Sequence, residues 1–257
     1  MTAMSARQRA ELQTGDGVQD EAAERGLFIT FEGCDGSGKS TQVARLAAYL
    51  RATGRSVVET REPGGSPRAE AIRALLLSGK ASRFGPFAET MLFNAARADH
   101  LRVAIRPALA RGSIVICDRF ADSTRAYQGV LGEVSPELVA AAEEAVVGET
   151  KPDLTLILDL PAELTMKRLA ARGGPGAASD KFEADALAHH AQLRQAFLDI
   201  AARAPERCVV VSARRSVDQV AKRIQRLVEA RLEGSKPKPQ ARRLTKVVDG
   251  RASRQGR

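Results

Sequence analysis

A single stretch near the start of the chain constrains the fold more than any other part of the sequence. Gly33, Gly38, Lys39 and Ser40 fit the pattern G-x-x-x-x-G-K-[ST], which is found where a strand leads into a helix. A β-prone run precedes the pattern and a helical segment, 41–50, follows it. Glycines here let backbone N–H groups turn inward around phosphate oxygens, and the helix N-terminus adds positive potential. We therefore predict a phosphate-binding loop rather than only a tight turn.

Short β-prone runs recur along the chain. They cover 27–31, 56–60, 114–117, 154–159 and 208–212. The last three are continuously apolar, which is typical of strands buried on both faces of a parallel sheet. Helical segments separate the runs. This alternation predicts an α/β fold of the P-loop NTPase type, a doubly wound parallel sheet of five strands with flanking helices and a small mobile lid.

Several helix starts can be located from capping residues. Ser66 and Ser135 are each followed by proline, which is the order preferred at an N-cap and the first helical position. Ser216 and Gln219 have the spacing of a capping box. We expect a helix to begin at each of these positions.

Composition indicates one domain with extensions at both ends. The chain has 257 residues, of which 44% are hydrophobic, enough for a sizeable core. We expect the domain over 27–233, a disordered extension at 1–26 and a basic disordered tail at 234–257. The first segment lacks the apolar stretch of a secretory signal. No apolar run approaches the roughly 20 residues that span a membrane, so we expect no membrane contact.

The net charge of +9 is concentrated in the tail, where eight lysines and arginines accompany one aspartate. Such a tail is either a nucleic-acid-binding arm or a solubilising segment. We favour the second interpretation, because the tail has no aromatic side chain that could stack on a base.

The cysteines and histidines do not indicate a metal centre. Cys34, Cys117 and Cys208 match no metal-ligand spacing, so we expect reduced thiols in a cytoplasmic protein. His189 and His190 are adjacent and are expected on a solvated helix. We assign no histidine a catalytic role.

The phosphate-binding loop predicts a nucleoside triphosphate and Mg²⁺ as ligands. Lys39 is expected to bridge the β- and γ-phosphates, and Ser40 to ligate the metal, with Asp118 as the second metal ligand. Residues 150–153, TKPD, have the letters of a guanine-reading motif but precede a strand. Ligands in such folds bind at the carboxyl ends of strands, so we reject a signalling GTPase in favour of a small transferase.

Polar residues after the second and third strands could form the acceptor site. They are Arg61, Arg119, Ser123, Thr124, Tyr127 and Gln128. On the helix predicted over 87–109, Phe93 and Arg97 are four residues apart and share a face. The ring could stack on a planar base while the guanidinium donates to its carbonyl. Taken alone, Phe93 would be core packing, and Arg97 a solvated side chain or an ion-pair partner.

Together these blocks resemble the bacterial thymidylate kinases of the P-loop nucleoside monophosphate kinase superfamily. The matching blocks are GCDGSGKST (33–41), REPGG (61–65), FNAAR (93–97), DRFADSTRAYQG (118–129) and KPDL (151–154). Their combination is far more specific than any one of them. The resemblance covers about residues 27–233. It implies ATP-dependent phosphorylation of dTMP to dTDP by direct in-line transfer, and a homodimer formed through the helices around 86–110 and 136–147.

The resemblance also implies residue roles. ATP is bound by the loop residues Gly33, Cys34, Asp35, Gly36, Ser37, Gly38, Lys39, Ser40 and Thr41. The dTMP-binding residues are Asp35, Arg61, Phe93, Arg97, Arg119, Ser123, Thr124, Tyr127 and Gln128. Asp35 meets the uncharged 3′-hydroxyl of the sugar, which explains a carboxylate in a phosphate loop. Phe93 stacks on thymine, Arg97 donates to its carbonyl, and Tyr127 crowds the 2′ position.

Catalysis is then assigned to Lys39, Asp35, Arg119 and a lid cation. One family subgroup has an arginine directly after the loop acid, where this chain has Gly36. The other subgroup supplies arginine from the lid, expected here at about 168–185. We choose Arg172 as this cation, with Arg168 and Lys181 as alternatives.

Two other functions remain open from the sequence. A kinase for another nucleotide would share the phosphate loop and would be exposed by a substrate panel. A nucleic-acid-binding ATPase using the basic tail would show DNA-stimulated ATP hydrolysis, but no apolar run ending in adjacent acids supports it.

Overall fold

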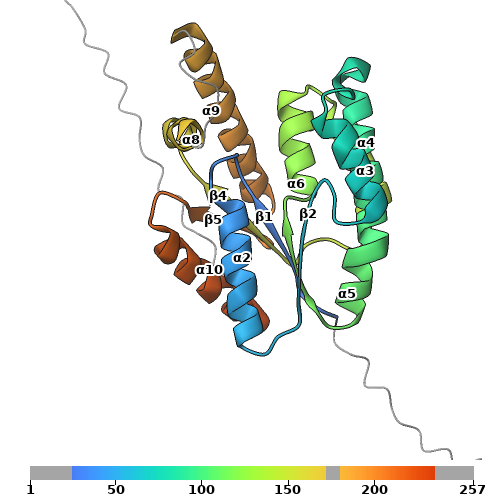
Figure 1. Cartoon of the computed structure of the whole chain (residues 1–257), viewed down its shortest axis with the longest axis vertical. Helices are drawn as coiled ribbons and strands as arrows, with labels where there is room; N and C mark the ends of the chain where they lie inside the picture. Colours follow the sequence, from blue (N-terminus) through green and yellow to red (C-terminus); the bar gives the residue numbers. More distant parts are fainter. Residues whose placement is uncertain (1–24, 172–179, 235–257) are drawn as a thin grey trace, which may run out of the picture.

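The computed structural model describes residues 25–171 and 180–234, the first five of the second range as backbone only. Its centre is a five-stranded parallel sheet in the order β2-β3-β1-β4-β5 (Figure 1). The strands are β1 (Phe28–Glu32), β2 (Val57–Arg61), β3 (Ile114–Asp118), β4 (Leu154–Asp159) and β5 (Cys208–Ser212). The prediction of five parallel strands is confirmed, and no strand boundary differs from the expected one by more than one residue.

Two helices cover one face of the sheet. They are α2 (Lys39–Ala52), which follows the phosphate loop, and α10 (Val217–Leu232), which packs beside it. Leu46 of α2 and Ile224 of α10 share one apolar core with strand residues such as Ile29 and Leu156. Burial of this continuous core fixes the start of α2, and with it the phosphate loop, against the end of β1.

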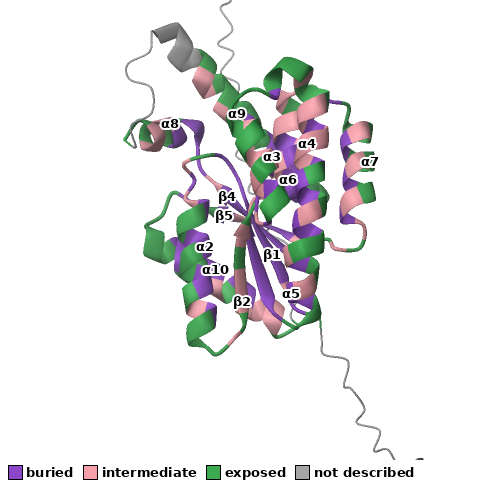
Figure 2. Cartoon of the chain, turned by 45° about the vertical axis from the view of Figure 1, so that its right-hand side comes forward, coloured by how far each residue is buried: buried purple, intermediate pink, exposed green. Residues whose placement is uncertain are grey.

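The opposite face is covered by helices that carry acceptor-site residues. The chain passes from α4 (Gly85–His100) through a π-helical turn, η2 (Leu101–Ile105), into α5 (Arg106–Ala110), and α9 (Asp180–Arg203) packs on β4 and β5. The remaining described helices are α3 (Pro67–Leu77), η1 (Ser82–Phe84), α6 (Ala121–Thr124), η3 (Arg125–Leu131), α7 (Pro136–Val147) and α8 (Ala162–Ala170). Figure 2 shows the central strands largely buried between these layers.

All three predicted helix starts are confirmed, and the serine side chain caps the helix at two of them. Ser216 and Gln219 form the expected capping box, and Ser135 Oγ accepts a hydrogen bond from Leu138 N. Ser66 does precede α3, but its side chain does not cap the helix. Its hydroxyl donates to Asp99 Oδ2 on α4 at 2.7 Å.

The described chain begins two residues before the expected start of the domain. Arg25 donates through Nη1 to both carboxylate oxygens of Asp153, and Gly26 N donates to Leu109 O at 2.9 Å. Both residues are therefore attached to the fold, although we expected them in the disordered extension. The rest of that extension and the tail from 235 lie outside the described residues.

The three cysteines are buried and free, as expected for reduced thiols. Within the described residues, no helix is both long and apolar enough to cross a membrane.

Candidate active site

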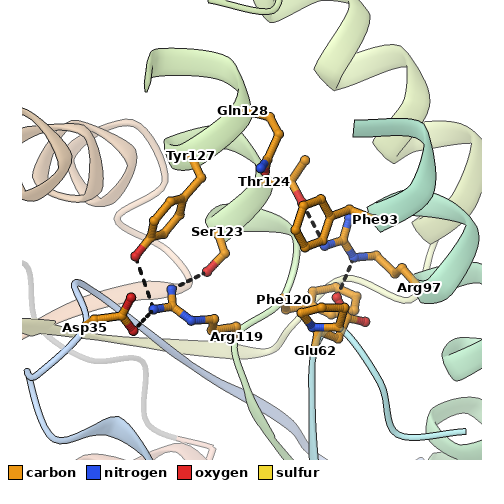
Figure 3. Close-up of a pocket in the computed structure, with 11 residues that line it drawn as sticks. Asp35, Glu62, Phe93, Arg97, Arg119, Phe120, Ser123, Thr124, Tyr127 and Gln128 are labelled. Atoms are coloured by element: carbon orange, nitrogen blue, oxygen red, sulfur yellow. Dashed lines mark hydrogen bonds and ion pairs between the residues drawn. The ribbon is translucent and has the colours of Figure 1, made fainter. Parts of the chain in front are cut away.

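A cavity opens at the carboxyl ends of β1, β2 and β3, where the phosphate loop, α4 and the α6–η3 segment meet. It is lined by Asp35, Glu62, Pro63, Phe93, Arg97, Arg119, Phe120, Ser123, Thr124, Tyr127 and Gln128 (Figure 3). Every one of these residues lies in or next to a block that the sequence singled out. The cavity therefore brings together residues up to 93 positions apart in the sequence, Asp35 and Gln128.

One end of the cavity adjoins the phosphate loop. Arg119 Nη2 donates to Asp35 Oδ1 at 2.6 Å and to Tyr127 Oη at 3.2 Å, while its Nη1 donates to Ser123 Oγ at 3.0 Å (Figure 3). Arg119 follows β3 with φ 70°, a left-handed conformation that is uncommon outside glycine. Such backbone strain concentrates at functional sites. This end thus pairs a carboxylate with a fixed guanidinium beside the loop.

The other end has the character of a base-binding slot. The half-buried ring of Phe93 faces the cavity, and Arg97 beside it is 2% exposed. Arg97 Nε donates to Glu62 Oε2 at 2.8 Å and its Nη2 donates to Thr124 Oγ1 at 2.9 Å (Figure 3). The Arg97 guanidinium also lies over the Phe120 ring, 5.1 Å from its centroid. An apolar plane and a fixed fork of donors suit a planar ring that carries carbonyl oxygens.

The lysine of the phosphate loop, Lys39, donates hydrogen bonds to backbone carbonyls of the same loop. Lys39 Nζ donates to Gly33 O at 3.0 Å and to Cys34 O at 2.9 Å, and lies 4.0 Å from Asp35 Oδ1. Burial and the charge of Arg119 lower the pKa of Lys39 to about 8. Partial burial of Asp35 opposes its ionisation, but Arg119 and Lys39 outweigh burial and lower the pKa of Asp35. Asp35 is therefore ionised at neutral pH.

Ser40 and Asp118 form a pair suited to Mg²⁺. Ser40 Oγ donates to Asp118 Oδ2 at 2.5 Å at the start of α2. A hydroxyl and a carboxylate supply the oxygen donors that Mg²⁺ prefers, and Mg²⁺ takes few protein ligands because phosphates and water complete its shell. No cluster of three or more metal-ligating His, Cys, Asp or Glu exists among the described residues. The donor set therefore fits a phosphate-bound Mg²⁺ rather than a metal held by protein alone.

A buried glutamate holds the turn that carries Arg119. Glu32 accepts from Phe120 N at 2.7 Å and from Ser123 Oγ at 2.6 Å. Burial, and then the nearby Asp122, raise the pKa of Glu32 to about 8. The Glu32 carboxyl group is thus largely protonated near neutral pH and fastens the end of β1 to the segment after β3.

Of the described residues predicted to bind dTMP, Arg61 does not line the cavity. Arg61 is exposed and its Nη2 donates to both carboxylate oxygens of Glu70, at 3.0 and 3.1 Å, rather than lining the pocket. Arg172 lies outside the described residues, as does the segment 173–179. Of the alternatives, Arg168 donates to Ala213 O at 2.9 Å and to Gly36 O at 3.4 Å, so it already contacts the phosphate loop.

Sequence reasoning missed several members of the site. Glu62 lies within the REPGG block, but the sequence gave no reason to assign it a function. Nothing in its local sequence indicates that it contacts Arg97. Phe120 was quoted only as part of a motif. His190 lies on the helix α9, as expected, and does not line the cavity, but it is close enough to Asp35 for each charge to shift the pKa of the other. Helical periodicity could have predicted which face of its helix His190 occupies. It could not have predicted that this face approaches Asp35 of the phosphate loop.

Comparison with known proteins identifies the family. A family model described as thymidylate kinase matches residues 31–224. The thymidylate kinase of Caulobacter vibrioides is 55% identical over 208 residues, which are 81% of this chain and 98% of that protein. The thymidylate kinase of Nitrobacter hamburgensis is 56% identical over 197 residues, 77% of this chain and 85% of that protein. A solved structure of thymidylate kinase from Ehrlichia chaffeensis superposes with a TM-score of 0.65 at 33% identity, covering 79% of this chain and 99% of that chain. The chain, with its phosphate loop and its slot for a planar base, belongs to the thymidylate kinase family.

Proposed function

We propose that the chain transfers the γ-phosphoryl group of ATP to dTMP, giving dTDP and ADP, and that dTMP occupies the cavity of Figure 3. The observation that carries the assignment is the arrangement of this one cavity. A ring and a buried guanidinium lie at one end, and the Asp35–Arg119 pair lies at the other, against the phosphate loop. The cavity thereby has a place for a base and a place for the sugar phosphate next to the donor site.

Thymine fits the slot between Phe93 and the Arg97–Thr124 pair. Phe93 offers its face for stacking, and Arg97 has two N–H groups for which no partner is found among the described residues. These can donate to a thymine carbonyl. Gln128 and Thr124 line the same end and can contact the edge of the base.

The sugar and the phosphate fit the opposite end. The ionised Asp35 can accept from the 3′-hydroxyl, which carries no charge to repel it. Arg119, supported by Ser123, can hold the dTMP phosphate, and Tyr127 limits the space around the sugar. Arg61 would join the phosphate only after exchanging its ion pair with the exposed Glu70, which costs little because such surface pairs contribute about 0–1 kcal/mol.

ATP is placed by the phosphate loop. Backbone N–H groups and Lys39 would hold its β- and γ-phosphates, and Ser40 with Asp118 would hold Mg²⁺. When bound, Mg²⁺ would neutralise charge on the phosphates. Lys39 would exchange its bonds to Gly33 O and Cys34 O for bonds to phosphate oxygens.

The reaction itself is direct in-line transfer. An oxygen of the dTMP phosphate attacks the γ-phosphorus of ATP, the bond to the β-γ bridging oxygen breaks, and ADP leaves with that electron pair. No side-chain nucleophile is needed, because positioning and charge neutralisation supply the rate. Lys39 and Arg119 lie where they can serve this purpose. We assign the remaining cation to Arg172, since the described contacts of Arg168 engage backbone carbonyls.

Calorimetric titration of dTMP tests this placement. Phe93→Ala should weaken dTMP binding roughly 5- to 150-fold, because base stacking on an aromatic contributes about 1–3 kcal/mol. Affinity for a non-hydrolysable ATP analogue should not change. Phe84→Ala is the matched control, because Phe84 is 60% exposed and does not line the cavity. Unchanged dTMP affinity in Phe93→Ala would contradict the proposed base slot.

We also propose a cytoplasmic homodimer that uses α4 and its neighbours. Phe87 on α4 and Val103 on η2 are exposed apolar side chains, 54% and 42% respectively, on the helical segment expected to pair. The buried thiols suit a reducing compartment. Light scattering should give twice the mass of the chain.

The ends, 1–24 and 235–257, are proposed to be dispensable for the reaction, and removing them should leave turnover unchanged.

A further inference from the structure

Arg97 is a buried cation whose orientation is fixed on three sides. Its Nε donates to Glu62 Oε2, its Nη1 to Asn94 Oδ1 at 3.3 Å and its Nη2 to Thr124 Oγ1. The Arg97 and Glu62 side chains are 2% and 5% exposed. A buried arginine needs a charged partner, because an unpaired buried charge is strongly destabilising. Among the described residues Glu62 is the anion that contacts the Arg97 guanidinium.

Glu62 is itself held from its far side. Its second oxygen, Oε1, lies 3.1 Å from Nδ1 of the fully buried His100, and His100 Nε2 lies 2.6 Å from Thr60 Oγ1. Thr60 and Glu62 flank the end of β2, while Arg97 and His100 lie three residues apart on α4. The hydrogen bonds therefore form one chain, Thr60–His100–Glu62–Arg97, that crosses from the sheet to the wall of the cavity.

The chain of bonds also assigns its protons. The Glu62 carboxylate can only accept, so His100 Nδ1 carries the hydrogen. In the neutral imidazole His100 Nε2 then accepts, and the Thr60 hydroxyl donates to it. His100 acts as a donor to Glu62 because Thr60 satisfies its other nitrogen. Each member thereby fixes the role of the next.

The backbone of Gly65 packs closely against the His100–Thr60 end of this chain of hydrogen bonds. A Cβ added at Gly65 would lie 2.3 Å from His100 Nε2 and 2.5 Å from Thr60 Oγ1, so the backbone there presses directly on their hydrogen bond. Gly65 has φ 82°, which glycine adopts freely. The glycine of the REPGG block thus serves the His100–Thr60 contact as well as the turn.

We propose that Glu62 and His100 are positioning residues that set the Arg97 guanidinium for reading the base. Because Arg97 donates to Glu62 through Nε, its Nη groups remain directed at Thr124 and the cavity. His100 prevents the Glu62 carboxylate from rotating away. The inference rests on the proposed function, because it concerns how this same cavity selects thymine over cytosine. The 4-carbonyl of thymine can accept a hydrogen bond from arginine, whereas the 4-amino group of cytosine cannot.

The test is the selectivity for dTMP over dCMP, measured as the ratio of their kcat/KM values. Glu62→Gln keeps the shape but removes the charge, and should lower kcat/KM for dTMP roughly 10- to 150-fold, the range for one hydrogen bond to a charged group. The dTMP:dCMP ratio should fall with it, and KM for ATP should stay unchanged. His100→Asn retains a donor at the Nδ1 position and should preserve more of the ratio than His100→Gln.

Glu143→Gln is the matched control. Glu143 accepts from Arg125 Nε and Nη2 at 2.8 and 2.7 Å, but neither residue lines the cavity. This variant should lose stability without losing selectivity. A wild-type ratio in Glu62→Gln, or equal ratios in both His100 variants, would overturn the positioning role. If Glu62→Gln does not fold, the two His100 variants decide. Wild-type protein that does not phosphorylate dTMP would instead refute the proposed function.

Discussion

Replacing Asp35 by asparagine separates an acceptor-site role from a role in ATP binding. The Asp35 carboxylate accepts from Arg119 Nη2 at 2.6 Å and lies 4.0 Å from Lys39 Nζ. Its side chain is 65% exposed, so solvent screens these charges. Surface ion pairs of this kind contribute about 0–1 kcal/mol, and Asp35→Asn should therefore change folding stability little.

The expected effect on the reaction is much larger. If the Asp35 carboxylate accepts from the 3′-hydroxyl of dTMP, asparagine replaces a charge-assisted hydrogen bond by a neutral one. A bond to a charged group contributes about 1.5–3 kcal/mol, which corresponds to a decrease in kcat/KM for dTMP of roughly 10- to 150-fold. The variant should keep its melting temperature to within a few degrees, since about 1 kcal/mol shifts the melting temperature of a chain of this size by about 2–4 °C.

The assay couples ADP release to a spectroscopic readout while dTMP and ATP are varied separately. Asp218→Asn is the matched control, because Asp218 is an exposed acid paired with Arg45 on the surface and does not line the cavity. It should behave as wild type. A collapse of ATP affinity in Asp35→Asn with unchanged dTMP kinetics would refute the reasoning, because it would place Asp35 on the donor side.

Two further predictions concern catalysis and pH. Arg172→Ala should lower kcat far more than it raises KM for dTMP, because a cation that acts in the transition state affects mainly turnover, and an unchanged rate would move the role to Arg168 or Lys181. Glu32 keeps its proton in the folded state up to about pH 8, whereas the unfolded chain releases it above about 4.5, so the melting temperature should fall across this interval and level off above it. Glu32→Gln should remove that part of the slope in a pH series of melting curves, and an identical slope would show that Glu32 is ionised.

The sheet could be predicted because its signal is local. Continuous apolar runs such as 154–159 and 208–212 have few alternatives to buried parallel strands, and the structure places them there. The helix expected over 87–109 was less well defined. It is interrupted by the π-helical turn η2, and residue propensities do not distinguish an i+5 from an i+4 hydrogen bond.

The residues of the site that lie within sequence motifs could be predicted. Phe93 and Arg97 share the cavity with Thr124, as a common face and the strand ends suggested. Contacts between blocks could not be predicted, because they depend on tertiary geometry. Ser66 precedes its helix as predicted, but its hydroxyl donates to Asp99, and Arg61 pairs with Glu70 instead of lining the cavity. Glu62 meets Arg97 of α4 from the segment after β2, a contact between residues 35 positions apart that neither block indicates alone.

The most direct test of the whole interpretation is an ADP-release assay of the full chain with Mg-ATP against dTMP, dUMP, dCMP, dGMP and thymidine. We expect turnover to be fastest with dTMP, with dCMP poor because its 4-amino group cannot accept from Arg97, and dGMP poor because its base is a larger, two-ring purine. Thymidine should be inactive, since it lacks the phosphate that accepts the phosphoryl group. No ADP release with dTMP but release with another acceptor would contradict the assignment of this cavity to dTMP. ATP hydrolysis that occurs only when DNA is added would contradict it as well.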